Sequence, residues 1–259
     1  MQHGFAQLAA HLSASKLKIA ALPKNYPCYH KSQILILAPL NFSVGKDKLK
    51  RFAEVNTFGN VVQLDAGKPF KGKWSADFFK NNNPIVLELA CGKGEYTVNL
   101  ARLFPQRNFI GIDYKGNRIW RGAKTALEDG VTNVGFLRIQ IENILDYFGS
   151  HEVDEIWITF PDPQPQLSRE KKRLTSPQFL EKYRPILKPG GIIHLKTDND
   201  ALHAYTAEKI AHHELQLHAK TEDLYHSEHA DEVLSIKTYY EKKYLLKNKN
   251  INYIKFSLE

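Results

Sequence analysis

The stretch IVLELACGKG, from Ile85 to Gly94, indicates the class of fold. The residues from Ile85 to Ala90 are β-branched or leucine-rich, which is typical of a strand buried on both faces. Two glycines follow within Cys91 to Gly94, and Tyr96 to Phe104 (YTVNLARLF) then carries apolar residues at helical spacing. A buried strand, a glycine turn and a helix predict the start of a β–α–β unit.

The same alternation continues to the end of the chain. Strands are expected at 108–114, 134–139, 155–160, 192–196, 215–221 and 251–256. Helices are expected at 116–129, 176–187, 200–213 and 237–247, and a short helix follows the strand 134–139 and ends at about residue 148. Strands that alternate with helices of this length form a parallel sheet covered on both faces. The sequence therefore predicts an α/β protein with a single doubly wound, mostly parallel, Rossmann-like sheet whose last strand is antiparallel.

Composition restricts the partners that this chain can have. Its 259 residues carry a formal net charge of +8, which favours polyanionic partners such as nucleic acid or an anionic membrane surface. The longest uncharged apolar run, residues 34–42, is shorter than the roughly 18 residues that span a bilayer. The cysteines, Cys28 and Cys91, form no CxxC motif, which is typical of a reducing compartment. These features predict a protein of a reducing, cytoplasmic compartment with a polyanionic partner and no membrane span.

The N-terminal segment differs from the rest of the chain. Residues 1–46 contain no Asp, Glu or Arg, and the first acidic residue is Asp47. A transit peptide would be poor in acids but rich in arginine, so a poorly ordered extension is the preferred interpretation for residues 1–43. Residues 44–83 are expected to form a basic N-terminal arm, and residues 84–259 the folded domain.

The turn after the first strand is expected to bind a cofactor, because ligands of such sheets lie at the carboxyl ends of the strands. Gly92 and Gly94 would let a ligand approach the next helix's N-terminus. Asp113 ends the second strand, where an acid commonly binds ribose hydroxyls. Glu88 would repel a pyrophosphate and attract an amino or sulfonium group, and Thr97 replaces the third glycine of a dinucleotide motif. The pattern favours S-adenosylmethionine over NAD.

Polar side chains also follow the third strand. Gln140 and Glu142 lie where either could hydrogen-bond the edge of an adenine. They extend the predicted cofactor site.

The fourth strand ends in FPDPQPQLSREKKRLT, residues 160–175. Asp162 lies between Pro161 and Pro163, which restrict the backbone and so hold its carboxylate in a narrow range of directions. We expect Asp162 to be catalytic, aimed at the transferring methyl group or its acceptor. Basic side chains follow at Arg169, Lys171, Lys172 and Arg173. They predict a loop that binds phosphates.

Two further motifs follow later in the sequence, one at the same edge of the sheet and one near the end of the chain. KTDN, residues 196–199, places Asp198 at the end of the fifth strand. TYYE, residues 238–241, opens a basic segment that is also expected to cover the sheet as an amphipathic helix.

These motifs together carry a family resemblance. LELACGKGE, GIDY, FPDPQP followed by KKRLTSPQFL, LKPGG, KTDN and TYYE resemble, in order and spacing, the tRNA (guanine-N7)-methyltransferase family. GKDKLKRFAE, residues 45–54, is similar to the short basic arm that precedes the domain in that family. The resemblance implies a class I methyltransferase that uses S-adenosylmethionine to methylate N7 of a guanosine in the tRNA variable loop.

The resemblance also implies roles for particular residues. Contacts with the cofactor are implied for Glu88, Asp113 and Asp162, and contacts with the guanosine for Asp198, Thr238 and Glu241. Gln164 and Gln166 stand where the family usually has Trp and Lys, so a substrate contact by Gln166 would be a hydrogen bond and not a charge contact. Gln140 stands where the family has an acid, and either it or Glu142 is expected to contact adenine.

Other functions stay open at this point. One is a methyltransferase acting on an amine of a protein or small molecule, although Gln164 occupies the place of the aromatic residue common in such enzymes. Another is an RNA-binding module with a decayed catalytic site, and a third is an NAD-dependent oxidoreductase. No metal is expected, because His226 and His229 lack a clear further set of ligands.

Overall fold

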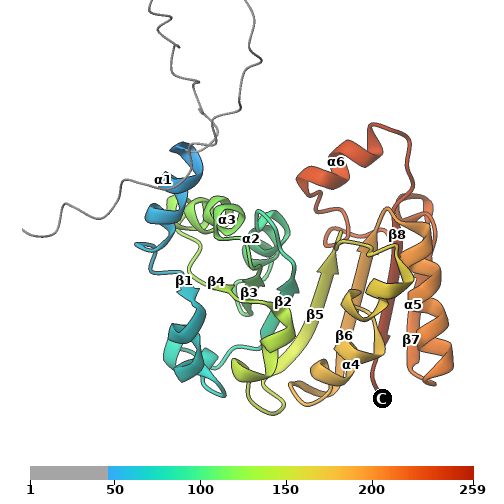
Figure 1. Ribbon diagram of the computed structural model, residues 1–259, viewed down its shortest axis with the longest axis horizontal. Coiled ribbons are helices and arrows are strands. Elements are labelled where there is room, and N and C mark those ends of the chain that lie inside the picture. Colours follow the sequence, from blue (N-terminus) through green and yellow to red (C-terminus); the bar gives the residue numbers. More distant parts are fainter. Residues whose placement is uncertain (1–45) are drawn as a thin grey trace, which may run out of the picture. The chain divides into compact units, whose positions relative to one another are not determined.

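One eight-stranded sheet forms the centre of the computed structural model, which describes residues 46–259 (Figure 1). The strands are β1 (Val61–Gln63), β2 (Ile85–Leu89), β3 (Asn108–Ile112), β4 (Val134–Arg138), β5 (Val153–Thr159), β6 (Leu187–Thr197), β7 (Gln216–Thr221) and β8 (Asn252–Ser257). Their order in the sheet is β1-β4-β3-β2-β5-β6-β8-β7. The first six in this order are parallel, whereas β8 runs antiparallel to β6 and to β7. The predicted doubly wound sheet with an antiparallel last strand is confirmed. The extension predicted for residues 1–43 lies outside the described residues.

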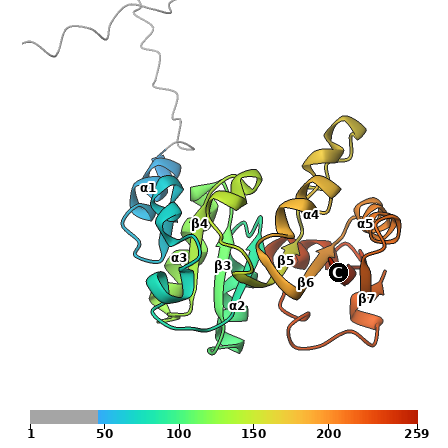
Figure 2. The same cartoon turned by 90° about the horizontal axis from the view of Figure 1, so that it is seen from below.

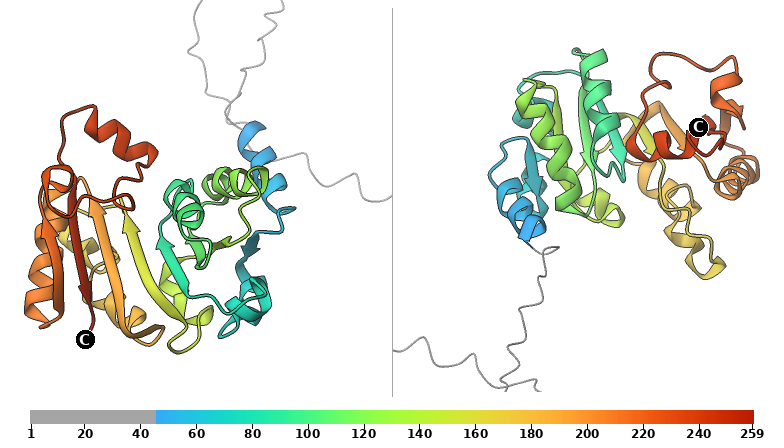
Figure 3. Two further views of the ribbon diagram at one scale, coloured as in Figure 1. Left: turned by 180° about the vertical axis from the view of Figure 1, so that it is seen from behind. Right: turned by 90° about the horizontal axis from the view of Figure 1, so that it is seen from above.

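Helices cover both faces of the sheet (Figures 2 and 3). The α-helices are α1 (Lys46–Val55), α2 (Glu95–Leu103), α3 (Gly116–Glu128), α4 (Pro177–Tyr183), α5 (Asp200–His212) and α6 (Tyr239–Leu245). The 3₁₀-helices are η1 (Leu64–Phe70), η3 (Ile141–Asp146), η4 (Leu167–Lys172) and η5 (Leu224–His226), and η2 (Trp74–Phe78) is a π-helix. Buried side chains of α2 and α3 pack on one face, and those of α4 and α5 pack on the other.

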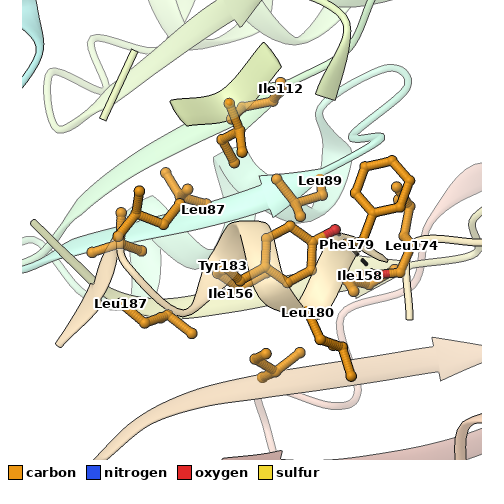
Figure 4. Packing of buried hydrophobic residues seen from close by; sticks show 14 of the residues in the cluster. Leu87, Leu89, Ile112, Ile156, Ile158, Leu174, Phe179, Leu180, Tyr183 and Leu187 are labelled. Atoms are coloured by element: carbon orange, nitrogen blue, oxygen red, sulfur yellow. Dashed lines mark hydrogen bonds between the residues drawn. The ribbon is translucent and has the colours of Figure 1, made fainter. Parts of the chain in front are cut away.

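The alternation of side chains along β2 produces these two cores. Val86 is buried towards α2 and α3, whereas Leu87 and Leu89 are buried on the opposite face. Figure 4 shows Leu87 and Leu89 in the cluster that also holds Leu180 and Tyr183 of α4. All five side chains are at most 3% exposed, so both faces of the central strand contribute hydrophobic stabilisation.

Residues before the first predicted strand also join the sheet. β1 pairs in parallel with β4, so the segment expected to be a basic arm provides an edge strand. Trp74 of η2 is 1% exposed and donates its indole N–H to the carbonyl oxygen of Tyr147 at 2.7 Å. Burial of a large aromatic ring fixes this part of the segment against the domain.

Some element boundaries differ from those expected. The helix expected over 176–187 ends at Tyr183, and β6 begins at Leu187 rather than at Ile192. Val153 pairs with Leu187 and Glu155 with Ile192, so residues 188–191 form an irregularity where a turn was expected. Such bulges bend a strand without ending it, which periodicity alone does not reveal.

The order in which strands are added reverses at β2. Strands β3 and β4 lie on one side of β2, and the chain then returns to place β5 on the other side. This is the topological switch point, where doubly wound sheets bind their ligands at the carboxyl ends of the strands. A ligand site is therefore expected beside the residues that follow β2 and β5.

Candidate active site

The strands on either side of the switch point end in left-handed backbone. Ala90 after β2 has φ of 57°, Phe160 after β5 has φ of 49°, and Gln164 has φ of 45°. These values cost non-glycine residues about 1 kcal/mol or more each and are found preferentially at functional sites. The two sharp turns direct the segments after β2 and β5 over the same edge of the sheet.

The two glycines of the turn have different roles. Gly94 has φ of 68°, and a Cβ added there would lie 2.7 Å from Cζ of Phe136 on β4. Gly92 has φ of 57°, but the nearest atom to an added Cβ would be 4.0 Å away. Gly94 is therefore required for packing beneath the turn, whereas the side of the turn at Gly92 is open to a ligand.

Glu88 lies beneath this turn and is 2% exposed. Its carboxylate accepts hydrogen bonds from the backbone N–H of Thr97 at 2.8 Å, from the hydroxyl of Thr97 and from the hydroxyl of Thr159. Burial raises the pKa of Glu88 to about 7, although these hydrogen bonds oppose the shift. The structure gives Glu88 a supporting role for the turn, and a direct contact with a cofactor stays a prediction.

Asp113 follows β3 and lies beside the same turn. Its carboxylate accepts hydrogen bonds from the backbone N–H of Gly92 at 3.0 Å and of Lys115 at 2.7 Å. The side chain is 7% exposed, and burial raises the pKa of Asp113. Asp113 therefore lies beside the glycine turn, as expected.

Three further predicted residues have exposed side chains at this edge. Gln140 precedes η3, and Glu142 lies in its first turn. Asp162 is exposed in the Pro-Asp-Pro turn, where its carboxylate accepts a hydrogen bond from the backbone N–H of Gln164 at 3.0 Å. Which of Gln140 and Glu142 contacts adenine stays a prediction.

The four predicted phosphate-binding residues fall into two groups. Arg169, Lys171 and Lys172 are exposed on η4, which projects beside α4 (Figure 2). Arg173 is partly buried and donates from Nε to the carbonyl oxygen of Gln164 at 3.2 Å. The carbon of its guanidinium group lies 4.3 Å from the ring centroid of Tyr205 on α5. Arg173 therefore fixes the Pro-Asp-Pro turn against α5.

Gln166 occupies the position before η4 and is exposed. The side chain of Gln166 does not cap this helix. Its amide is consequently available to a substrate, as expected for a hydrogen-bonding contact.

Asp198, at the end of β6, lines an acidic cavity of about 380 Å³. Lys249 Nζ lies 3.4 Å from its carboxylate. The other lining residues are Asp200, Glu222, Asn248 and Asn250. Carboxylate and amide oxygens accept hydrogen bonds, so this cavity suits a ligand with several N–H donors.

Thr238 and Glu241 form a capping box at the start of α6. Glu241 N–H donates to the hydroxyl of Thr238 at 3.2 Å, and Thr238 N–H donates to the carboxylate of Glu241 at 3.2 Å. Glu241 is fully buried, and its carboxylate also accepts from the hydroxyl of Tyr225 and lies 2.8 Å from Lys196 Nζ. The T-x-x-E pattern signals such a cap. A contact between Glu241 and guanosine stays a prediction.

Sequence reasoning missed the contacts that join α6 to the glycine turn. Tyr239 N–H donates to the carboxylate of Glu95 at 2.7 Å, and Lys93 Nζ lies 3.7 Å from the ring centroid of Tyr239. Figure 3 shows α6 extending from the β8 side of the sheet towards α2. The predicted cofactor turn and the predicted substrate segment are therefore in contact.

Two other kinds of site are absent from residues 46–259. No group of three or more His, Cys, Asp or Glu side chains lies in an arrangement that could hold a metal ion. None of the helices in this range is both long enough and apolar enough to cross a membrane.

Comparison with known proteins identifies the class and then the family. The 16S rRNA methyltransferase KamB has the same fold, with a TM-score of 0.54 and 16% identity over 72% of this chain and 93% of KamB. Residues 82–254 match a family described as putative methyltransferase. The fold and this match define a methyltransferase of the doubly wound α/β class.

Sequence relatives give the finer assignment. A tRNA (guanine-N(7)-)-methyltransferase of Bacteroides thetaiotaomicron is 51% identical over 221 residues, which cover 83% of this chain and 87% of that protein. The protein of the same description from Christiangramia forsetii is 52% identical over 224 residues, covering 83% and 99%. The chain belongs to the tRNA (guanine-N7)-methyltransferase family.

Proposed function

We propose that this protein transfers a methyl group from S-adenosylmethionine to N7 of a guanosine in the variable loop of tRNA. The observation that carries the proposal is that the glycine turn and the Pro-Asp-Pro turn follow neighbouring parallel strands. Leu89 of β2 pairs with Ile158 of β5, so Gly92 and Asp162 follow neighbouring strands at the same edge of the sheet. We assign the reaction to residues 84–259, preceded by the basic arm of residues 44–83.

The residues at the glycine turn fit S-adenosylmethionine. Gly92 leaves the turn open, and the carboxylate of Asp113 is held beside it. The exposed side chains of Gln140, Glu142 and Asp162 supply further polar groups at the same edge. When bound, S-adenosylmethionine supplies a methyl group on a cationic sulfur. Asp113 would hold ribose hydroxyls, and Gln140 or Glu142 the adenine.

The acceptor needs little chemical activation. N7 of a neutral guanine has a free lone pair, so the reaction requires no strong base and depends mainly on alignment of the reacting groups. The base becomes cationic as it is methylated. Carboxylates fixed beside it, those of Asp162 and Asp198, would stabilise this charge and bind the N–H groups of the guanine. The segment containing Thr238 and Glu241 would complete the guanosine site.

The basic loop would bind the tRNA backbone. Arg169, Lys171 and Lys172 are exposed next to the Pro-Asp-Pro turn and are suited to phosphate contacts. The net charge of +8 adds long-range attraction to a polyanion. Because tRNA is the substrate, we place the enzyme in the cytoplasm.

The proposal is tested by incubating the full chain with bulk tRNA and S-adenosylmethionine labelled in the methyl group, followed by nucleoside analysis. Label in 7-methylguanosine is the expected result. Label in another nucleoside would keep the methyltransferase and discard the target base. Saturable cofactor binding without transfer to tRNA would favour an amine in a protein or small molecule as the acceptor. Neither binding nor transfer would favour a decayed RNA-binding module.

A further inference from the structure

Lys196 lies inside the sheet and has no role in the site described so far. It is 0% exposed and sits near the end of β6, paired in register with Thr159 on β5 and with Tyr253 on β8. Burying an ammonium group is costly unless its three donors all find acceptors. The identity of those acceptors therefore indicates what the lysine is used for.

All of the polar contacts of this ammonium are with one distant segment. Lys196 Nζ donates to the carbonyl oxygens of Leu234 at 2.6 Å and Ile236 at 3.1 Å, and lies 2.8 Å from the carboxylate of Glu241. The rings of Tyr96 and Tyr225 lie near the same ammonium, with centroids at 5.3 and 5.7 Å. One sheet residue thus fixes both the loop before α6 and the first turn of α6.

The main chain of Lys196 is tied to the other half of the site. Its carbonyl oxygen accepts a hydrogen bond from Phe160 N–H at 2.8 Å, directly before the Pro-Asp-Pro turn. Its side chain holds Glu241, and Tyr239 in the same helix contacts Glu95 beside the glycine turn. Lys196 is therefore the residue through which the strand end at Asp162 and the segment at α6 are kept in one arrangement.

We propose that Lys196 is a positioning residue, which holds residues 234–241 in the arrangement needed to bind the acceptor guanosine. This inference rests on the proposed function. Lys196 has no exposed surface, so it acts on the acceptor by holding this segment in place and not by contact. Without the ammonium, the buried carboxylate of Glu241 loses its counter-charge, and the carbonyl oxygens of Leu234 and Ile236 lose their donor.

The test compares Lys196→Met, which has a similar length and no charge, with wild type. Kinetic constants are expressed per bound S-adenosylmethionine, so that unfolded protein does not count. The KM for tRNA should rise by about tenfold or more, while the Kd for S-adenosylmethionine changes by less than about twofold. Amide hydrogen exchange should accelerate in residues 234–246 and stay unchanged in β2 and β3.

Two further variants sharpen the result. Lys255→Met removes another lysine of the sheet, on β8, and should leave KM and the exchange of residues 234–246 unchanged. Lys196→Gln is used if Lys196→Met does not fold, because its amide can still donate to a carbonyl oxygen. Lys196→Gln should also raise the KM for tRNA relative to wild type.

The outcomes separate this inference from the proposed function. Wild-type enzyme that methylates tRNA, together with a folded Lys196 variant of unchanged KM, would overturn the positioning role alone. Faster exchange throughout the sheet in Lys196→Met would show a purely structural role and overturn it as well. Wild-type enzyme that methylates no tRNA would overturn the proposed function, and this role for Lys196 with it.

Discussion

The hydroxyl of Thr159 on β5 donates a hydrogen bond to the carboxylate of Glu88 on β2. This bond joins the two strands that flank the switch point, and Thr97 at the start of α2 bonds to the other oxygen of the same carboxylate. One buried acid therefore sets the positions of the glycine turn, the helix after it and the strand that leads to Asp162. Its protonation should affect the stability of the whole site.

Replacing Glu88 by Gln should change the pH dependence of stability. The pKa of Glu88 is raised from 4.5 to about 7 in the folded protein, so folding favours the protonated form. The resulting stability is complete below pH 4.5 and is lost as the pH rises to about 7. Gln cannot ionise, so it does not lose this stability. The free energy of unfolding of Glu88→Gln should therefore increase by about 3 kcal/mol relative to that of wild type as the pH rises from 4.5 to 8.

Urea unfolding of both proteins across this pH range measures the effect. The difference in free energy of unfolding between the two proteins isolates Glu88. Burial lowers the pKa of His194, so this histidine makes stability rise with pH, but it does so equally in both proteins and cancels in the difference. A difference that does not vary with pH would contradict the assignment of a raised pKa to Glu88.

Gly94→Ala should be much more destabilising than Gly130→Ala. The two glycines have φ of 68° and 65°, so both variants carry similar backbone strain. An added Cβ meets Phe136 at position 94 but meets nothing within 4 Å at position 130. Overpacking should lower the free energy of unfolding of Gly94→Ala by roughly 2 kcal/mol more, measured by denaturant titration. Equal losses would show that the contact with Phe136 is relieved without cost.

The sequence was sufficient to predict the central strands and the cofactor end of the site. The β-branched and leucine-rich run from Ile85 to Leu89 has the length of a strand, and the glycines after it mark its end, which favours a strand buried on both faces. Asp113 then had to lie beside them, because parallel strands end at one edge of the sheet. These features depend on local pattern and on topology that the pattern implies.

Contacts between distant segments could not be predicted in this way. The sequence shows a lysine in an apolar strand at Lys196 and a T-x-x-E motif ending in Glu241, but nothing local pairs them. Nothing in the sequence distinguishes the four cations that follow the Pro-Asp-Pro turn. In the structure only Arg173 among them packs on the ring of Tyr205 on α5, where it supports the turn. Such pairings are set by how loops and helices pack on the finished sheet, which periodicity does not specify.

Asp162→Ala should fold normally and lose most of its turnover. The side chain is exposed and its carboxylate accepts a hydrogen bond from Gln164 N–H, so stability should change by less than about 1 kcal/mol. The loss of a fixed carboxylate beside the developing cation should lower kcat by about 100-fold or more. Steady-state methylation of tRNA gives kcat, and thermal unfolding checks the fold. Normal methylation by this variant would rule out a catalytic Asp162.

Neutralising the basic loop should weaken tRNA binding and reduce its dependence on salt. In Lys171→Gln/Lys172→Gln, two exposed cations are lost, so the slope of log K against log salt should become shallower by roughly 1 to 2. Filter binding of tRNA from about 50 to 200 mM salt measures this slope.

Lys73→Gln/Lys80→Gln is the matched control. These lysines are also exposed, but they precede β2 and lie towards the opposite edge of the sheet, where Asn81 bonds to Asn108 at the start of β3. The control should keep the wild-type slope. A loop variant with the wild-type slope would place the tRNA backbone elsewhere on the protein.

We propose that N7 of a variable-loop guanosine accepts the methyl group. The most direct measurement compares two otherwise identical tRNAs, one with guanosine and one with 7-deazaguanosine at that single position, in methyl transfer from labelled S-adenosylmethionine. Methyl transfer is expected to the first tRNA and not to the second, because the second has carbon in place of the accepting nitrogen. Equal labelling of both tRNAs would contradict this proposal.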